Sequence, residues 1–162
     1  MCGIFAYTGT KDAKPLLLEG LQMLEYRGYD SAGIYLHDVG LTKTPGAVDA
    51  LRHQALAESF AKSGIAHLRW ATHGEPTEVN AHPHTDCKEE VYVAHNGIIE
   101  NYRELKDALS KKGHSFKSET DTEVLAHLIE EELKNKNTFE DAVLDTLSQV
   151  VGTYGLLISY AK

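Results

Sequence analysis

The chain has 162 residues, of which 42% are hydrophobic and 25% charged, and this ordinary composition predicts one globular domain with its own core. Its formal net charge of -8 argues against nucleic-acid binding driven by neutralisation of phosphates. No apolar stretch approaches the ~20 residues that span a bilayer, and the N-terminus lacks the layout of a secretion signal. Two cysteines make no disulfide framework, so we expect a cytoplasmic protein without membrane contacts.

The apolar pattern along the chain predicts short strands first, a group of helices late, and a strand last, which is typical of an α+β fold in layers. The polar stretch over residues 70–90 fits neither period, and a loop of that length is expected to be functional. Thr120 and Glu123 have the spacing of a helix capping box. Strands are expected at 4–8, 32–36, 64–68, 91–95 and 154–160, helices at 15–24, 48–62, 101–112, 120–134 and 138–150, and a loop at 39–46.

The second residue is a candidate nucleophile. Removal of Met1 is expected because the Cys2 side chain is small, and it would leave a thiol and a free α-amino group on one carbon. Such an amine can activate its own side chain. The amine titrates near ~8 and the thiol near ~8.5, so both are accessible at neutral pH. Position alone does not distinguish this role from a cysteine without one.

Three polar segments are further candidates, each with a structural alternative. Residues 26–33 suit a turn rich in Gly, Asp and Ser. Arg69 leaves a strand and enters the long loop, where it could bind a carboxylate with its planar fork or form a surface ion pair. In residues 95–101, Asn96 and Gly97 would suit either a tight turn or a pair of donors aimed at an oxyanion.

Six motifs gather these residues: Cys2-Gly3-Ile4, Leu24-Glu25-Tyr26-Arg27-Gly28-Tyr29-Asp30-Ser31-Ala32-Gly33, Arg69-Trp70-Ala71-Thr72-His73-Gly74, Asn80-Ala81-His82-Pro83-His84, His95-Asn96-Gly97-Ile98-Ile99-Glu100-Asn101 and Ser118-Glu119-Thr120-Asp121-Thr122-Glu123. In their sequences and their order along the chain, these motifs resemble those of the glutaminase domains of the glutamine–fructose-6-phosphate aminotransferase family, which are class II glutamine amidotransferases. The resemblance covers most of the chain. The first motif is shared by all class II enzymes, whereas the sequences of residues 26–33, 70–74 and 97–101 are more specific to this family.

The resemblance implies an N-terminal-nucleophile hydrolase fold, a four-layer α/β/β/α sandwich with two facing antiparallel sheets. It implies that Cys2 attacks the side-chain amide of glutamine while its own α-amino group moves the proton. Asn96 and Gly97 would hold the oxyanion. The ammonia released would serve synthesis of glucosamine 6-phosphate from fructose 6-phosphate, and no cofactor is implied.

The resemblance also implies how glutamine is bound. Arg69 would bind the α-carboxylate and Asp121 the α-ammonium, which agrees with the need of a zwitterion for one cation and one anion. An alternative for Asp121 is a carboxylate stabilised only by the helix dipole beside the Thr120 cap. The resemblance further implies that Trp70, Thr72 and His73 line the pocket and that His82 lies near it. Arg27 would order the loop around the nucleophile.

We do not expect a metal site. The spacing of His82, His84 and Cys87, with His73 and His95 nearby, loosely suggests zinc but fits no tight ligand signature. Cys87 lies in a polar segment and is expected to be a thiol without a role.

Two departures from the family pattern bear on the domain. Residues 37–62 match it poorly, and the chain ends at Lys162 before further strands and the sugar-phosphate isomerase domain of the family. We therefore expect residues 1–162 to form an incomplete glutaminase domain that lacks the isomerase domain in cis. The strand at 154–160 would then have an open edge that favours self-association. The alternatives are a glutaminase serving another acceptor and an inactive fragment.

Overall fold

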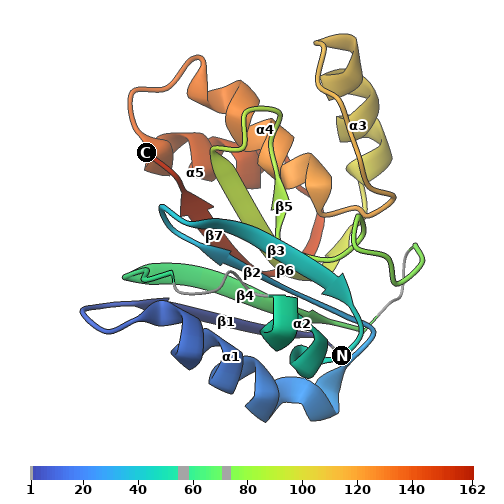
Figure 1. Ribbon diagram of the computed structural model, residues 1–162. Coiled ribbons are helices and arrows are strands. Elements are labelled where there is room, and N and C mark those ends of the chain that lie inside the picture. Colours follow the sequence, from blue (N-terminus) through green and yellow to red (C-terminus); the bar gives the residue numbers. More distant parts are fainter. Residues whose placement is uncertain (1, 55–58, 71–73) are drawn as a thin grey trace.

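A computed structural model describes residues 2–54, 59–70 and 74–162 of the chain (Figure 1). Two antiparallel sheets face each other between two layers of helices (Figure 1). The α+β sandwich of layers α/β/β/α that the sequence predicts is therefore confirmed. Among the residues described, no helix has both the length and the apolar character needed to cross a bilayer.

The first sheet has the strand order β1-β4-β2-β3, with every neighbouring pair antiparallel. Buried apolar side chains on one face of β2 and β4 pack against the helices of this layer. The elements are β1 (Gly3–Thr8), β2 (Ser31–Leu36), β3 (Gly40–Pro45), β4 (Ser63–Arg69), α1 (Ala13–Leu24), η1 (Glu25–Arg27) and α2 (Val48–Gln54).

The second sheet has the strand order β5-β6-β7, also antiparallel. One face of β6 packs against α4 in a separate apolar core, which the other two helices of this layer and β7 complete. The elements are β5 (His84–Thr85), β6 (Val91–Ile99), β7 (Gly152–Tyr160), α3 (Tyr102–Lys111), α4 (Glu123–Leu133) and α5 (Phe139–Gln149).

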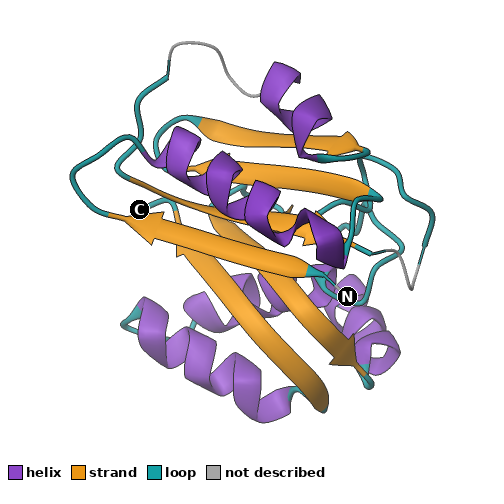
Figure 2. Cartoon of the chain, turned by 90° about the horizontal axis from the view of Figure 1, so that it is seen from below, coloured by secondary structure: helices purple, strands orange, loops and turns teal. Residues whose placement is uncertain are grey.

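A third apolar cluster joins the two sheets. The rings of Tyr35 on β2 and Tyr92 on β6 stack with centroids 3.6 Å apart and an interplanar angle of 13°. Ile65 and Ala94 complete this layer. Because side chains alternate along a strand, Tyr35 reaches the opposite sheet while its neighbours Ile34 and Leu36 reach the helices. Figure 2 shows that the strands of the two sheets run in different directions.

Two helices begin after a polar capping residue: α5 starts as the sequence predicts, whereas α1 begins at Ala13, two residues before the predicted start. Asp12 caps α1 by accepting a hydrogen bond from the Lys14 N–H at 3.4 Å, and Thr138 caps α5 by accepting one from the Asp141 N–H at 3.1 Å. Each cap satisfies a backbone donor that the helix itself leaves free. Short polar side chains thus fix where both helices start.

The capping box predicted at Thr120 is wrong. Helix α4 begins at Glu123, and the Thr120 hydroxyl instead lies 2.9 Å from His84 Nε2. The Glu123 carboxylate accepts hydrogen bonds from the backbone N–H groups of Lys117 and Ser118 at 2.8 and 2.7 Å. These bonds hold the segment before α4 in a non-helical bend, and this segment belongs to the pocket described below.

Three other expected boundaries differ from the structure. Residues 39–46 contain β3 rather than a loop, because Asp38 (φ 63°) and Gly40 (φ 139°) turn the chain tightly back onto β2. Residues 59–62 are not helical, and residues 55–58 lie outside the described part of the chain. Strand β6 continues through Asn96 to Ile99, so this segment is not the tight turn that was one alternative.

Candidate active site

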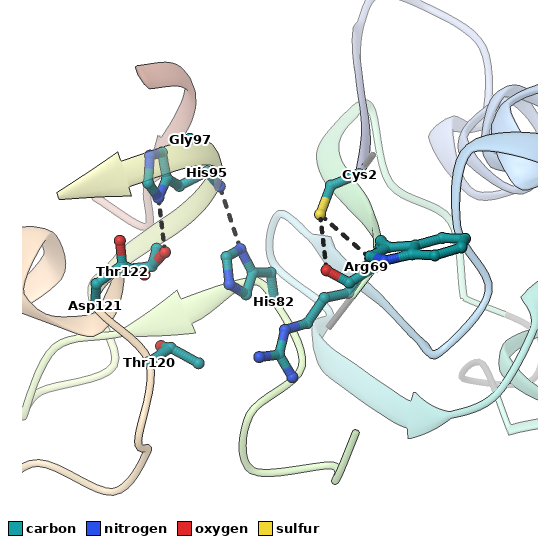
Figure 3. A pocket seen from close by; sticks show the side chains of 9 residues that line it. Cys2, Arg69, His82, His95, Gly97, Thr120, Asp121 and Thr122 are labelled. Atoms are coloured by element: carbon teal, nitrogen blue, oxygen red, sulfur yellow. Dashed lines mark hydrogen bonds between the residues drawn. The ribbon is translucent and has the colours of Figure 1, made fainter. Parts of the chain in front are cut away.

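The functional candidates meet because of strand register. Gly3 pairs with Leu68, so Cys2 before β1 lies beside Arg69 and Trp70 at the end of β4. Strand β6 and the segment before α4 approach from the other sheet, and together they enclose a pocket (Figure 3). Its lining residues are Cys2, Arg69, Trp70, His82, His95, Gly97, Thr120, Asp121 and Thr122.

The Cys2 thiol is held against the backbone of Trp70. The Trp70 N–H donates to Cys2 Sγ at 3.2 Å, and Cys2 Sγ lies 3.6 Å from the Trp70 carbonyl oxygen (Figure 3). Cys2 is a free thiol of intermediate exposure, while the Trp70 side chain is largely at the surface. The sulfur is therefore fixed in position and still accessible from the pocket.

Asn96 joins Cys2 to a buried histidine. Its Nδ2 donates to the Cys2 carbonyl oxygen at 3.3 Å, and its Oδ1 lies 3.0 Å from His67 Nε2. His67 Nε2 also lies 3.1 Å from the His95 carbonyl oxygen, which can only accept, so this nitrogen carries the proton. His67 thus orients the Asn96 amide with its NH₂ group toward Cys2. No sequence motif predicts a role for His67, although its alternation with Arg69 on β4 would place both side chains on one face of the sheet.

Gly97 has no possible substitute at its position. Its φ is +140°, in the region that favours glycine, and a Cβ there would lie 1.9 Å from the Thr153 carbonyl oxygen on β7. The backbone of Gly97 therefore lies in the pocket wall without a side chain. A larger residue would push β6 from β7 beside Asn96.

Arg69 supplies a buried positive charge. Its Nη1 donates to the Glu75 carbonyl oxygen at 3.1 Å and its Nη2 to that of Gly74 at 3.4 Å. Burial lowers the pKa of Arg69, and the carboxylates of Asp30 and Asp121 oppose that shift. Figure 3 shows the side chain extending from the Cys2 side of the pocket toward Thr120.

Asp121 supplies a negative charge to the same pocket. It is 8% exposed, and its Oδ2 accepts a hydrogen bond from the Ile99 N–H at 2.7 Å. Among the described residues, its Oδ1 has no hydrogen-bond partner. Asp121 lies two residues before α4 begins, so its position follows from β6 rather than from a helix cap.

A group of buried neutral histidines forms the base of the pocket. Burial lowers the pKa of His67 to about 3 and those of His82 and His84 well below the usual value. The rings of His67 and His82 stack with centroids 4.2 Å apart. His82 Nδ1 accepts a hydrogen bond from the His95 N–H at 3.3 Å, and His95 Nδ1 lies 2.8 Å from Thr122 Oγ1. His82 is one of the residues that line the pocket.

A more open hollow adjoins this pocket at Cys2. Its lining residues are Cys2, Arg27, Trp70, Asn96, Gly97, Ile98 and Thr153, so Arg27 and Cys2 line the same hollow. Thr72 and His73 lie outside the described residues. Thr120 and Thr122 line the pocket without having been singled out, because hydroxyls beside an expected cap give no separate sequence signal.

The arrangement suits one kind of chemistry. A thiol lies beside an oriented amide donor, as covalent catalysis on an acyl group requires. A cation and an anion lie in the same pocket, as a zwitterionic amino acid requires. A four-layer sandwich with a cysteine before its first strand, at a pocket between the sheets, defines the class of N-terminal-nucleophile hydrolases.

Comparison with known proteins agrees with this class. A family described as glutamine amidotransferase domain matches residues 67–161, and the chain belongs to that family. It is 53% identical over 163 residues to a Thermotoga maritima protein named glutamine–fructose-6-phosphate aminotransferase [isomerizing], covering 98% of this chain and 26% of that protein. The protein of that name from Pyrococcus horikoshii is 50% identical, with 99% and 28% covered. The chain thus spans about a quarter of the length of these relatives.

A solved structure of an amidotransferase has the same fold as this chain. Glutamine phosphoribosylpyrophosphate amidotransferase from B. subtilis, complexed with ADP and GMP, superposes with a TM-score of 0.81 at 30% identity, covering 99% of this chain and 35% of that one. The family resemblance and the N-terminal-nucleophile fold predicted from the sequence are both confirmed.

Proposed function

We propose that this chain, once Met1 is removed, hydrolyses the side-chain amide of glutamine to glutamate and ammonia. The observation that carries the proposal is the meeting of the Cys2 thiol with the opposite charges of Arg69 and Asp121 in one pocket, with the Asn96 amide bonded to Cys2 in the adjoining hollow. Family membership supports the same chemistry.

The mechanism divides into two acyl transfers. Cys2 Sγ bonds to the amide carbon of glutamine while its proton passes to the α-amino group of Cys2. The oxygen becomes an oxyanion, which the Asn96 NH₂ group and the Gly97 N–H stabilise. The carbon–nitrogen bond then breaks, and the α-ammonium returns its proton to the leaving ammonia. Water attacks the thioester, giving glutamate and the free thiol.

Binding and pocket shape are assigned to the remaining residues. Arg69 binds the α-carboxylate and Asp121 the α-ammonium of glutamine, so that the side-chain amide faces Cys2. The family resemblance assigns Trp70, Thr72 and His73 to the lining of the pocket, with His82 near it, and it assigns Arg27 to ordering the loop around the nucleophile. No cofactor takes part in these steps.

We further infer that the ammonia serves synthesis of glucosamine 6-phosphate from fructose 6-phosphate. The names of relatives about half identical to this chain support this acceptor, and their greater length leaves room for a sugar-phosphate isomerase domain in cis. Residues 1–162 then form part of the glutaminase domain. A different acceptor is the second candidate, because the phosphoribosylpyrophosphate amidotransferase shares the fold at 30% identity.

Two further inferences concern self-association of the chain and the cellular compartment in which it works. Strand β7 is an edge of its sheet among the described residues, and an open edge of this length can pair with a second copy. A reducing cytoplasm would keep the Cys2 thiol free for catalysis.

The proposal is tested by measuring glutamate formed from glutamine. The unsubstituted chain should release glutamate, and Cys2→Ala should abolish release while the chain keeps its circular dichroism spectrum. The matched control is Ser110→Ala, which removes one polar atom at an exposed position on α3 and should leave the rate unchanged. Equal rates for the Cys2→Ala variant and the unsubstituted chain would contradict the proposal.

A further inference from the structure

Four potential metal ligands meet in the layer of the second sheet, away from the pocket residues. They are Cys87 in the turn between β5 and β6, His114 after α3, and His127 and Glu130 on α4. One ligand atom from each lies within 4.8 Å of all the others. The two histidines and Glu130 are buried, whereas Cys87 is exposed.

The measured distances approach those of a tetrahedral site. Cys87 Sγ lies 3.5 Å from His127 Nδ1 and 3.9 Å from His114 Nδ1. Glu130 Oε2 lies 3.1 Å from His114 Nδ1 and 3.7 Å from His127 Nδ1. Around a tetrahedral zinc ion with bonds of about 2.0–2.3 Å, neighbouring ligand atoms are about 3.3–3.7 Å apart. These four distances lie close to that range, and the remaining pairs of ligand atoms, which are at most 4.8 Å apart, would have to shorten by up to about 1 Å to close the site.

Both histidines are also oriented as metal ligands usually are. Each presents Nδ1 to the common centre and Nε2 to a second carboxylate. His114 Nε2 lies 3.0 Å from Glu131 Oε2, and His127 Nε2 lies 3.6 Å from Glu123 Oε1. The contact of His127 is electrostatic, since its Nε2 is buried without a hydrogen bond. Outer carboxylates of this kind fix the ring orientation and increase ligand basicity.

One backbone donor favours a thiolate at Cys87, whereas burial and the Glu130 carboxylate raise the pKa of the metal-free thiol, so a bound cation would itself drive the deprotonation. The Ser115 N–H donates to Cys87 Sγ at 3.5 Å, and the Cys87 N–H donates to Glu130 Oε2 at 3.2 Å. Lys88 Nζ lies 3.9 Å from Glu130 Oε1, which adds one positive charge near the acidic groups. The exposed sulfur also gives an ion a path of entry.

We propose that Cys87, His114, His127 and Glu130 bind one zinc ion. The mixed set of one sulfur, two imidazole nitrogens and one carboxylate oxygen is of the kind that zinc accepts, and four protein ligands make a closed, structural site. The ion would tie the turn after β5 and the segment after α3 to α4, the helix that follows Asp121. This inference does not depend on the proposed glutaminase activity. The sequence missed the site because the ligands lie far apart in the chain.

The test uses the full chain with Cys2→Ala, so that Cys87 is the one thiol left. Metal-free protein is titrated with Co²⁺, followed by the thiolate-to-cobalt absorption and the visible bands of tetrahedral cobalt. One equivalent should bind and Zn²⁺ should displace it. Cys87→Ser and His114→Gln should each remove the signal, and Glu131→Gln should weaken binding about 10–100-fold.

His53→Gln is the matched control, because His53 is exposed on α2 and should leave the titration unchanged. Zn²⁺ should also raise the melting temperature of the parent chain and leave that of Cys87→Ser unchanged. The proposal is overturned if the parent chain binds no Co²⁺ at micromolar concentration, or if Cys87→Ser gives the same spectrum. The cluster would then be a hydrogen-bonded ionic network without a metal.

Discussion

Asn96 lies between buried His67 and the carbonyl group of Cys2, and its amide is oriented before substrate arrives. A preoriented donor costs no reorganisation when negative charge develops on the substrate oxygen. Asn96 is therefore expected to stabilise the transition state more than the bound substrate.

Asn96→Ala should lower kcat about 10²–10³-fold with little change in KM, because the amide meets a charge present only in the tetrahedral intermediate. Steady-state kinetics of glutamate release will measure both constants. Equal losses in substrate affinity and turnover would instead indicate a collapse of β6 around Gly97.

Arg69→Lys and Asp121→Asn should raise KM for glutamine far more than they lower the melting temperature. Lys lacks the planar fork of Arg, and Asn keeps an oxygen to accept the Ile99 N–H but loses the charge. Each lost charged contact should cost about 1.5–3 kcal/mol of binding. A sharp fall in melting temperature with unchanged affinity would mean that both residues are structural.

At the scale of elements, most strands and helices could be predicted from the sequence. The spacing of apolar residues and the presence of capping residues depend only on neighbouring positions in the chain. The predicted ends were wrong for elements whose ends depend on contacts with residues far away in the chain. β6 continues through Asn96 because β7 pairs with it, and α4 starts late because Thr120 bonds His84 instead of capping the helix. For the same reason His67 was missed: its role exists only where β4 and β6 meet.

The buried histidines on β4, β5 and β6 should make the fold sensitive to acid. An unfolded histidine gains its proton below about pH 6.5, whereas folded His67 resists protonation until about pH 3. Its contribution to stability is thus complete above pH 6.5 and is lost as pH falls toward 3. At pH 5 the loss from His67 alone is about 2 kcal/mol.

Urea unfolding at pH 7 and pH 5 measures this effect. The free energy of unfolding should fall between the two, and His67→Gln should reduce the fall. His53→Gln, at an exposed position, should leave it unchanged. A pH-independent free energy, or an equal fall in His67→Gln, would show that these rings do not control acid stability.

At the scale of the whole molecule, two sheets that meet through Tyr35 and Tyr92 bring the first residues of the chain against β6. Residue 2 and residue 96 thereby share a site that neither sheet could form alone. We propose that this architecture, after loss of Met1, makes Cys2 a nucleophile with a free α-amino group.

Labelling with an electrophilic analogue of glutamine, followed by intact mass and peptide mapping, tests that claim most directly. We expect a chain without Met1 that carries one adduct, located on Cys2, and we expect glutamine to protect that thiol. A chain that retains Met1, or an adduct found on Cys87 alone, would contradict it.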